Sequence, residues 1–153
     1  MTKKLLITID GPAGAGKTTV SRALADRLGY CYIDTGALYR GVALAAKSRK
    51  IDLQDDAQLA RLCSELELTF IRNEKGLRLL ANGDDISDYI RTPEITMLAS
   101  AVSARTVVRR YLLELQRDLG NQKSAVFEGR DMGTVVFPDA DVKFFLNAST
   151  RKR

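Results

Sequence analysis

Hydrophobic and polar positions along the chain predict strands and helices in alternation. An apolar run over residues 5–10 has the length of a buried strand, and a glycine-rich stretch follows it. From Thr18 apolar residues recur at helical spacing as far as Gly29, and glycine is a common residue at the end of a helix. The first 29 residues therefore predict a strand, a loop and a helix in that order.

Later segments continue this alternation. The further expected helices are about 36–48, capped by Thr35, then 55–66, and a helical region that begins after Pro93 and ends at Gly120; the further expected strands are 30–34, 125–129 and 142–148, the last two of the buried type. Strands that alternate with helices predict a parallel sheet covered on both faces.

One segment has a different period. Leu66, Leu68 and Phe70 alternate with polar positions, a turn is expected at 73–76, and a second alternation over 77–81 ends at the turn dipeptide Asn82-Gly83. This pattern predicts a small antiparallel meander inserted into the parallel sheet. The expected fold class is therefore α/β, with three α/β/α layers, a mainly parallel sheet and an inserted meander.

Composition narrows the chemistry. The chain has 153 residues, of which 45% are hydrophobic, so one ordinary globular core is expected. It contains no histidine, which excludes imidazole bases, serine-type triads and the common zinc sites. Cys31 and Cys63 form no CxxC pair, and neither a leader nor a membrane-length apolar run is recognised. We therefore expect a reduced, cytoplasmic protein without membrane contact.

The net charge of +5 is compatible with two kinds of anionic partner, a nucleic acid or a small phosphorylated ligand. The one basic block is Arg151-Lys152-Arg153, and basic residues are not interleaved with aromatic ones. We therefore expect no nucleic-acid partner. Separately, we expect the protein to be a monomer.

Residues 11–18 fit the phosphate-binding pattern G-x-x-x-x-G-K-[ST] between a predicted strand and a predicted helix. Glycines let successive N–H groups turn inward at a helix N-terminus, where the helix dipole also favours anions. Lys17 is expected to reach the β- and γ-phosphates, and the Thr18 hydroxyl to complete the shell of a magnesium ion. The loop predicts a bound nucleoside triphosphate, although GTPases, ATPases and small-molecule kinases all share it.

Further charged residues follow the predicted strands. Arg40 and Arg130 lie just beyond strands 30–34 and 125–129, at the carboxyl edge where α/β folds bind ligands, and Arg109 lies on a helix. Arginine grips phosphate with two donors, so these residues could form a second phosphate site or could be solvated surface residues. Glu128 is expected to orient magnesium, whereas Asp34 could bind ligand or serve as a cap.

Three stretches together resemble bacterial cytidylate kinases, a family of P-loop nucleoside monophosphate kinases. The stretches are GPAGAGKTT from residue 11, DTGALYR over 34–40 and EGRDMGTVVFPDA over 128–140. The resemblance extends over the whole chain and implies transfer of the γ-phosphoryl group of ATP to CMP or dCMP, with Mg²⁺ as cofactor. It also implies a discontinuous P-loop core over 1–62 and 104–153, with 63–103 as the inserted monophosphate-binding region.

The resemblance assigns site residues one by one. The implied ATP-binding residues are Gly11, Ala13, Gly14, Ala15, Gly16, Lys17, Thr18 and Thr19; the implied CMP-binding residues are Thr35, Tyr39, Arg40, Ser100, Arg109, Arg130 and Asp131; the implied catalytic residues are Lys17, Arg40 and Arg130; the metal residues are Thr18 and Glu128. An Asp, a Ser and an Arg can supply the acceptor and donors that a cytosine edge requires.

One departure from the family concerns the end of the chain. Residues 148–153 stop where the resemblance implies an arginine-rich lid helix. We therefore expect the lid and the final sheet strand to be missing from this chain, either because the sequence is a fragment or because the lid function has been dropped. We therefore expect weak activity from this chain. Two alternatives to a cytidylate kinase remain open. One is another P-loop kinase that acts on a different monophosphate or on a small metabolite, and the other is a nucleotide-binding module without turnover.

Overall fold

The structure is a computed structural model that describes residues 3–147. The chain forms two compact units. The core unit comprises the described residues up to Thr35 and from Leu115 onward, and the inserted unit is Gly36–Glu114. The predicted insertion, 63–103, is narrower than this unit, and its assignment to monophosphate binding stays a prediction. The predicted start of a lid at 148–153 lies outside the described residues.

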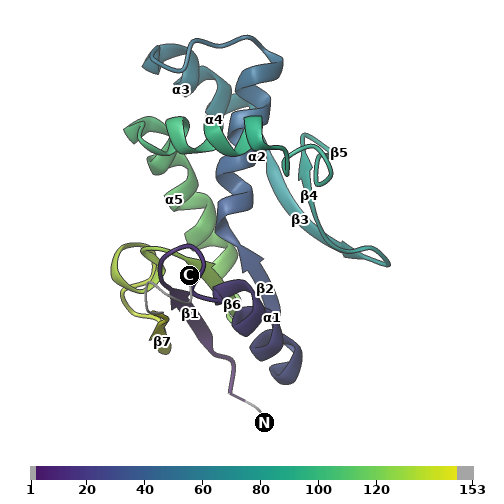
Figure 1. Ribbon diagram of the computed structural model, residues 1–153, viewed down its shortest axis with the longest axis vertical. Helices are drawn as coiled ribbons and strands as arrows, with labels where there is room; N and C mark the ends of the chain where they lie inside the picture. Colours follow the sequence, from purple (N-terminus) through teal and green to yellow (C-terminus); the bar gives the residue numbers. More distant parts are fainter. Residues whose placement is uncertain (1–2, 148–153) are drawn as a thin grey trace. The chain divides into compact units, whose positions relative to one another are not determined.

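The core unit contains a four-stranded parallel sheet in the order β2-β6-β1-β7 (Figure 1). Its strands are β1 (Leu6–Asp10), β2 (Cys31–Asp34), β6 (Ala125–Gly129) and β7 (Val142–Phe145). All three pairings are parallel, so the carboxyl ends of β1, β2 and β6 lie at one edge. Because β1 is central, the loop that follows it opens where strand connections diverge to either side, the usual position of a ligand site.

Helix α1 (Lys17–Leu28) covers one face of this sheet. Ala25 and Leu24 of the helix pack against a buried cluster that includes Ile7, Ile9 and Val126 of the strands. These strand residues alternate with residues that face the opposite side, as expected for the period of two in a strand. The apolar spacing predicted from Thr18 to Gly29 marks the buried face only in part, because Val20 and Leu28 are 42% and 44% exposed whereas Ser21 and Ala25 are the buried residues of the helix.

The other face of the sheet is covered by a short π-type helix, η1 (Met132–Val136), and the residue that follows it. The Phe137 ring lies 4.6 Å from the Phe127 ring of β6, and Gly120, at the end of α5 (Thr106–Gly120), lies against Phe137. The predicted three-layer α/β/α fold with a parallel sheet is confirmed.

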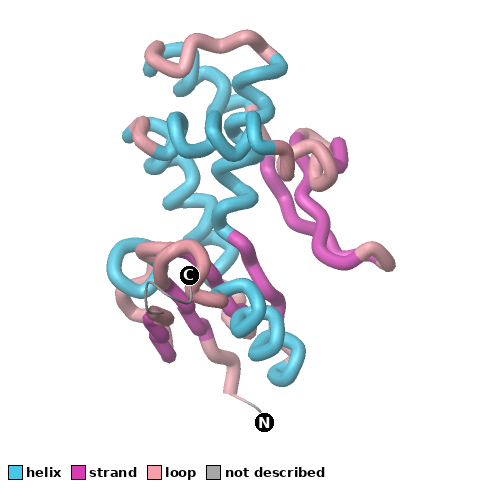
Figure 2. The backbone as a smooth tube through the Cα atoms, viewed as in Figure 1, coloured by secondary structure: helices cyan, strands magenta, loops and turns pink. Residues whose placement is uncertain are grey.

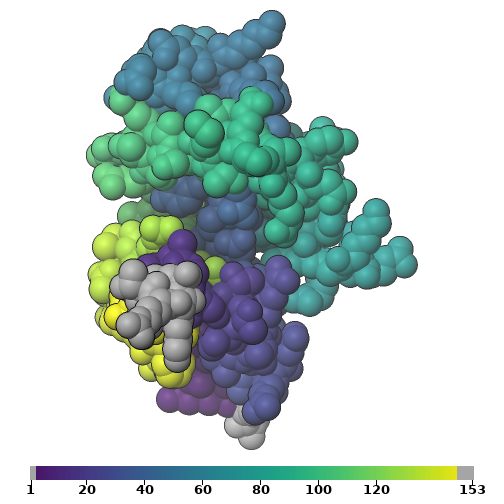
Figure 3. Space-filling model, viewed as in Figure 1, coloured from purple at the N-terminus to yellow at the C-terminus, as the bar shows by residue number. Residues whose placement is uncertain are grey.

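The inserted unit combines helices with a small antiparallel sheet (Figure 2). Its elements are α2 (Thr35–Ser48), α3 (Asp56–Glu65), β3 (Leu68–Asn73), β4 (Gly76–Ala81), β5 (Asp84–Asp85), α4 (Pro93–Ser103) and the part of α5 up to Glu114. Thr35, the first residue of α2, belongs to the core unit. The sheet approaches α2 at Gly41, where the side-chain ends of Leu68 and Leu79 lie against the helix. The tip of the β3–β4 hairpin projects from the rest of this unit (Figure 3). The predicted meander is confirmed.

Three details differ from the sequence expectation. The helical region after Pro93 is two helices, which separate at Ala104 and Arg105. Thr35 is the first residue of α2 rather than its cap, and its hydroxyl donates to the carbonyl oxygen of Glu128 in β6. The strand predicted as buried over 142–148 is shorter, and Phe145 is 70% exposed, because β7 has one strand neighbour in the described sheet. Across residues 3–147 no helix combines the length and apolar character required to cross a membrane.

Gly120→Ala is expected to destabilise the protein by about 1–3 kcal/mol, because the new methyl group would overlap a packed ring. An ideal Cβ at this position would lie 2.5 Å from Cε1 of Phe137. Urea unfolding measures the change. Gly41→Ala is the comparison, since its Cβ would lie 3.2 Å or more from flexible leucine and isoleucine ends and the helix gains propensity. Equal losses in the two variants would contradict the packing argument.

Candidate active site

The loop between β1 and α1 depends on backbone conformations that favour glycine. Gly11, Gly14 and Gly16 have φ values of 151°, 80° and 87°. Gly16 is the N-cap of α1 in the left-handed region, where a side chain would be strained. A Cβ on Gly11 would overlap the carbonyl oxygen of Leu146, so the loop also passes close to the chain after β7. The three motif glycines therefore occupy positions where other residues would disturb the loop.

Within residues 3–147, no side chain caps the N-terminus of α1. Gly16 makes no side-chain cap, and the first turn contains no acidic residue. In contrast, α3 and α4 are capped by the side chains of Asp55 and Thr92. The first N–H groups of a helix and its dipole favour an anion when no side chain fills that role. This end of α1 therefore has the chemistry of a phosphate site.

Lys17 brings a positive charge back over the loop. Its ammonium group donates to the carbonyl oxygens of Gly11 at 2.8 Å and Pro12 at 3.2 Å. The side chain thus spans the loop from its last residues to its first ones. An ammonium group held there can contact the distal phosphates of a bound nucleotide.

Glu128 connects the loop to the end of β6. Its side chain is 9% exposed, and one carboxylate oxygen accepts from the Thr18 hydroxyl at 3.1 Å. The other oxygen accepts from the Tyr32 hydroxyl at 2.7 Å. Burial, and then the nearby carboxylates of Asp34 and Glu128, raise the pKa of Tyr32, so it remains a donor across the physiological range. The carboxylate is therefore fixed beside the first turn of α1.

Tyr32→Phe is expected to lower the free energy of unfolding by about 1–3 kcal/mol, because a buried carboxylate loses a donor. The matched control is Tyr30→Phe, whose hydroxyl bonds backbone groups of Lys3 and Leu5 nearer the surface. The control is expected to lose less than about 1 kcal/mol. Urea unfolding measures the free energy of unfolding of both variants. Equal decreases in the two variants would argue against a special role of the Tyr32 hydroxyl.

The segment after β6 begins at the same sheet edge as the glycine loop. Asp10 and Gly129 are register partners, so the residues that follow each of them leave neighbouring strands at the same level. Arg130 and Asp131 come next and are exposed. The structure therefore brings the start of the predicted acceptor segment beside the start of the predicted ATP loop.

Thr35 and Asp34 lie at the end of β2, next to β6. Thr35 is 4% exposed, and its hydroxyl donates to the carbonyl oxygen of Glu128 at 2.7 Å. A Cβ on Gly129 would lie 2.9 Å from this hydroxyl oxygen, so glycine is required for the two strand ends to approach. Thr35 thus supports the strand that carries Glu128, and its predicted contact with CMP stays a prediction.

The other predicted acceptor residues belong to the inserted unit. Tyr39 and Arg40 lie half-buried near the start of α2, Ser100 is exposed on α4, and Arg109 is exposed on α5. Their roles toward CMP stay predictions. Three further residues of the ATP set, Ala13, Ala15 and Thr19, lie in the glycine loop or the first turn of α1.

Sequence reasoning missed two residues of this site, Tyr32 and Asp10. Tyr32 is hidden in an apolar strand pattern, and its partner Glu128 is 96 residues away along the chain. Asp10 is a carboxylate that ends a buried strand, which is an unusual place for an ionisable residue and could have served as the signal. Both contacts depend on the order of strands in the sheet.

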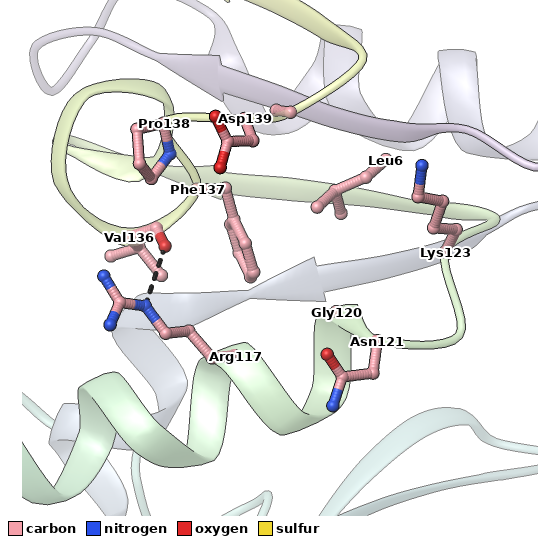
Figure 4. A pocket seen from close by; sticks show the side chains of 10 residues that line it. Leu6, Arg117, Gly120, Asn121, Lys123, Val136, Phe137, Pro138 and Asp139 are labelled. Carbon is pink, nitrogen blue, oxygen red and sulfur yellow. Dashed lines mark hydrogen bonds between the residues drawn. The ribbon is translucent and has the colours of Figure 1, made fainter.

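A pocket of about 420 Å³ lies elsewhere in the core unit, near the amino end of β1 (Figure 4). Leu6 and Phe137 contribute apolar surface, and the Arg117 guanidinium donates to the carbonyl oxygen of Val136 at 3.1 Å. Lys123 at its rim pairs with Asp141. Because the glycine loop follows the opposite end of β1, this pocket is separate from the candidate active site.

Comparison with known proteins places the chain in a family. The family model described as cytidylate kinase matches residues 7–153. A cytidylate kinase of Geobacter sulfurreducens is 58% identical over 149 residues, covering 97% of this chain and 64% of the relative. A cytidylate kinase of Syntrophotalea carbinolica is 52% identical, covering 100% of this chain and 65% of the relative. A bifunctional pantoate ligase/cytidylate kinase of Synechococcus is 47% identical and is covered over 32% of its length.

Two further comparisons set the extent of this similarity. The chain spans about 64% of the length of the first of these relatives. A solved structure titled "Crystal structure of TT1252 from Thermus thermophilus" has 21% identity and a TM-score of 0.42, covering 99% of this chain and 69% of that one, a likeness too weak to bear on the fold. The family match and the high identity over nearly every residue show that the chain belongs to the cytidylate kinase family.

Proposed function

We propose that this protein transfers the γ-phosphoryl group of ATP to CMP or dCMP, giving CDP or dCDP. The observation that carries the proposal is the register of β1 and β6, which starts the glycine loop and the Arg130 segment at neighbouring positions of one sheet edge. A kinase that joins two phosphates requires two anion sites that face each other. Membership in the cytidylate kinase family supports the choice of acceptor.

The triphosphate of ATP would bind the loop from Gly11 to Thr18. The N-terminus of α1 supplies backbone donors, and the Lys17 ammonium supplies a positive charge held 2.8 Å from the carbonyl oxygen of Gly11. These groups hold the phosphates in position and neutralise charge that grows on the transferred group.

Thr18 and Glu128 fit a magnesium ion by the chemistry of their donors. Both offer oxygen ligands, and their side chains are 3.1 Å apart beside the loop. Mg²⁺ favours sites of one or two protein oxygens completed by water and substrate phosphates. When bound, the ion would neutralise charge on the β- and γ-phosphates. Tyr32 would keep the Glu128 carboxylate oriented toward Thr18 in either case.

The acceptor nucleotide would bind through Arg130 and Arg40 at its phosphate. Ser100, Arg109 and Asp131 would recognise the cytosine edge, and Thr35 and Tyr39 would line the same pocket. A carboxylate can accept from the exocyclic amine of cytosine, whereas it meets a carbonyl at that position of uracil. The acceptor phosphate is an anion at neutral pH, so transfer requires no strong general base, in keeping with a chain that contains no histidine. The proposal includes a monomeric protein in the cytoplasm.

Product analysis tests this function. The chain is incubated with ATP, Mg²⁺ and one monophosphate at a time, and the diphosphates are separated by chromatography. CMP and dCMP are expected to give more product than UMP, AMP or dTMP. Equal or greater turnover of AMP or dTMP would overturn the assignment of the acceptor, and ATP binding without any diphosphate product would indicate a nucleotide-binding module.

A further inference from the structure

Asp10 makes an unusual pair of hydrogen bonds at the end of β1. Its side chain is buried, with 5% of the residue exposed. One carboxylate oxygen accepts from the backbone N–H of Met132 at 2.9 Å, and the other accepts from the N–H of Gly133 at 2.8 Å. The carbonyl oxygen of the same residue accepts from the N–H of Leu146. Asp10 thus ties the strand before the glycine loop to segments more than 120 residues away.

These bonds fix both ends of a two-residue segment. Gly129, before the segment, is held in the sheet by its pairing with Asp10. Met132, directly after it, is held by the Asp10 carboxylate. The residues between these two attachments are Arg130 and Asp131, which leave the sheet and return within a short distance. The segment has little freedom to move relative to β1.

The geometry explains why a carboxylate is required here. Burying a carboxylate is costly unless its oxygens are satisfied, and two backbone donors provide that compensation. An asparagine has one acceptor oxygen, and its amide group would meet the second N–H with another donor. Gly133 packs so closely that a Cβ would lie 2.9 Å from Oγ1 of Thr8, so the segment cannot easily shift to a new position.

We propose that Asp10 is a positioning residue for the acceptor nucleotide, because it holds Arg130 and Asp131 at a set distance from the glycine loop. This inference rests on the proposed function of Arg130 and Asp131. Asp10 itself touches neither nucleotide. Its loss is expected to weaken binding of CMP more than binding of ATP, since the glycine loop keeps its own glycine conformations and the Lys17 contacts.

Calorimetric titration of CMP and of ATP into the full chain tests the proposal in Asp10→Asn. Because the variant loses one charge-assisted hydrogen bond to the segment that carries Arg130, the Kd for CMP is expected to rise about tenfold or more. The Kd for ATP is expected to rise by less than about threefold. The matched control is Asp141→Asn. Asp141 also accepts from a backbone N–H of β1, that of Leu6 at 2.8 Å, but at the opposite end of the strand. This control is expected to leave both Kd values unchanged.

A second variant covers the case in which Asp10→Asn does not fold. Gly133→Ala pushes the same segment away from Thr8 and is expected to give the same selective loss of CMP binding. The proposal is overturned if the variants change both Kd values equally, or if Asp10→Asn matches Asp141→Asn. Absence of CMP binding in the unmodified chain would instead refute the proposed function, so the two failures are distinguishable.

Discussion

Lys17→Met is expected to slow phosphoryl transfer by about 1,000-fold, because it removes the positive charge that we propose to neutralise the transferred phosphoryl group. The methionine side chain has a similar length, so the substitution removes charge while keeping volume. Within residues 3–147, the Lys17 ammonium donates to the carbonyl oxygens of Gly11 and Pro12, which belong to its own loop. Both carbonyls can bond water instead, and the fold is expected to persist. Product formation from ATP and CMP measures the effect.

Lys4→Met provides the matched control for this substitution. Lys4 is exposed and precedes β1, at the end of the strand opposite the glycine loop. The control removes one positive charge from the same unit without touching the loop, so its rate is expected to equal that of the unmodified chain. An equal rate in Lys17→Met would refute the role given to this ammonium group.

Arg130→Met is expected to raise the KM for CMP about 100-fold while the KM for ATP changes little, because a guanidinium can give two charge-assisted bonds to one phosphate. Arg130 is exposed and follows the last residue of β6, so its replacement leaves the core packing intact. Arg130→Lys keeps the charge and loses the forked geometry, and an intermediate KM is expected. Steady-state kinetics with each nucleotide varied in turn measures both constants.

Arg27→Met serves as the control for Arg130. Arg27 is an exposed arginine in the last turn of α1, far along the helix from the glycine loop. It is expected to leave both KM values unchanged. A rise in the KM for ATP equal to that for CMP in Arg130→Met would show that the residue acts on the fold or on the other nucleotide.

The elements near the glycine loop could be predicted because local residue patterns decide them. The apolar run over 5–10, the motif glycines and Gly29 specify where β1 ends and where α1 begins and ends. The β3–β4 hairpin follows in the same way from alternation and from the turn at 73–76. In each case the signal and the structure it predicts lie within the same few residues.

Features that depend on distant contacts could not be predicted in this way. The break between α4 and α5 falls at Ala104 and Arg105, which carry no glycine or proline signal, and Arg105 there pairs with Asp56 of α3. The apolar pattern of Phe144 and Phe145 resembles that of a buried strand, but burial depends on how many neighbours the strand has. Local pattern carries no information about that number.

The candidate site shows the same division. The loop lysine and the acidic residue at the end of β6 follow from motif and position along the strands. Asp10 and Tyr32 act on partners at the end of β6 and just beyond it, and only the strand order β2-β6-β1 brings them together. Sequence position therefore identifies groups that are expected to contact ligand, while the groups that orient them become visible only in the folded sheet.

In the proposed complex, two nucleotides bind with their phosphates facing each other between the glycine loop and Arg130. The decisive test is a compound in which adenosine and cytidine are joined through one chain of phosphates, titrated calorimetrically in competition with ATP and with CMP. One molecule is expected to bind per chain, to be displaced by either nucleotide and to bind more weakly to both Lys17→Met and Arg130→Met. Displacement by ATP alone, with no effect of CMP or of Arg130→Met, would contradict the proposed complex.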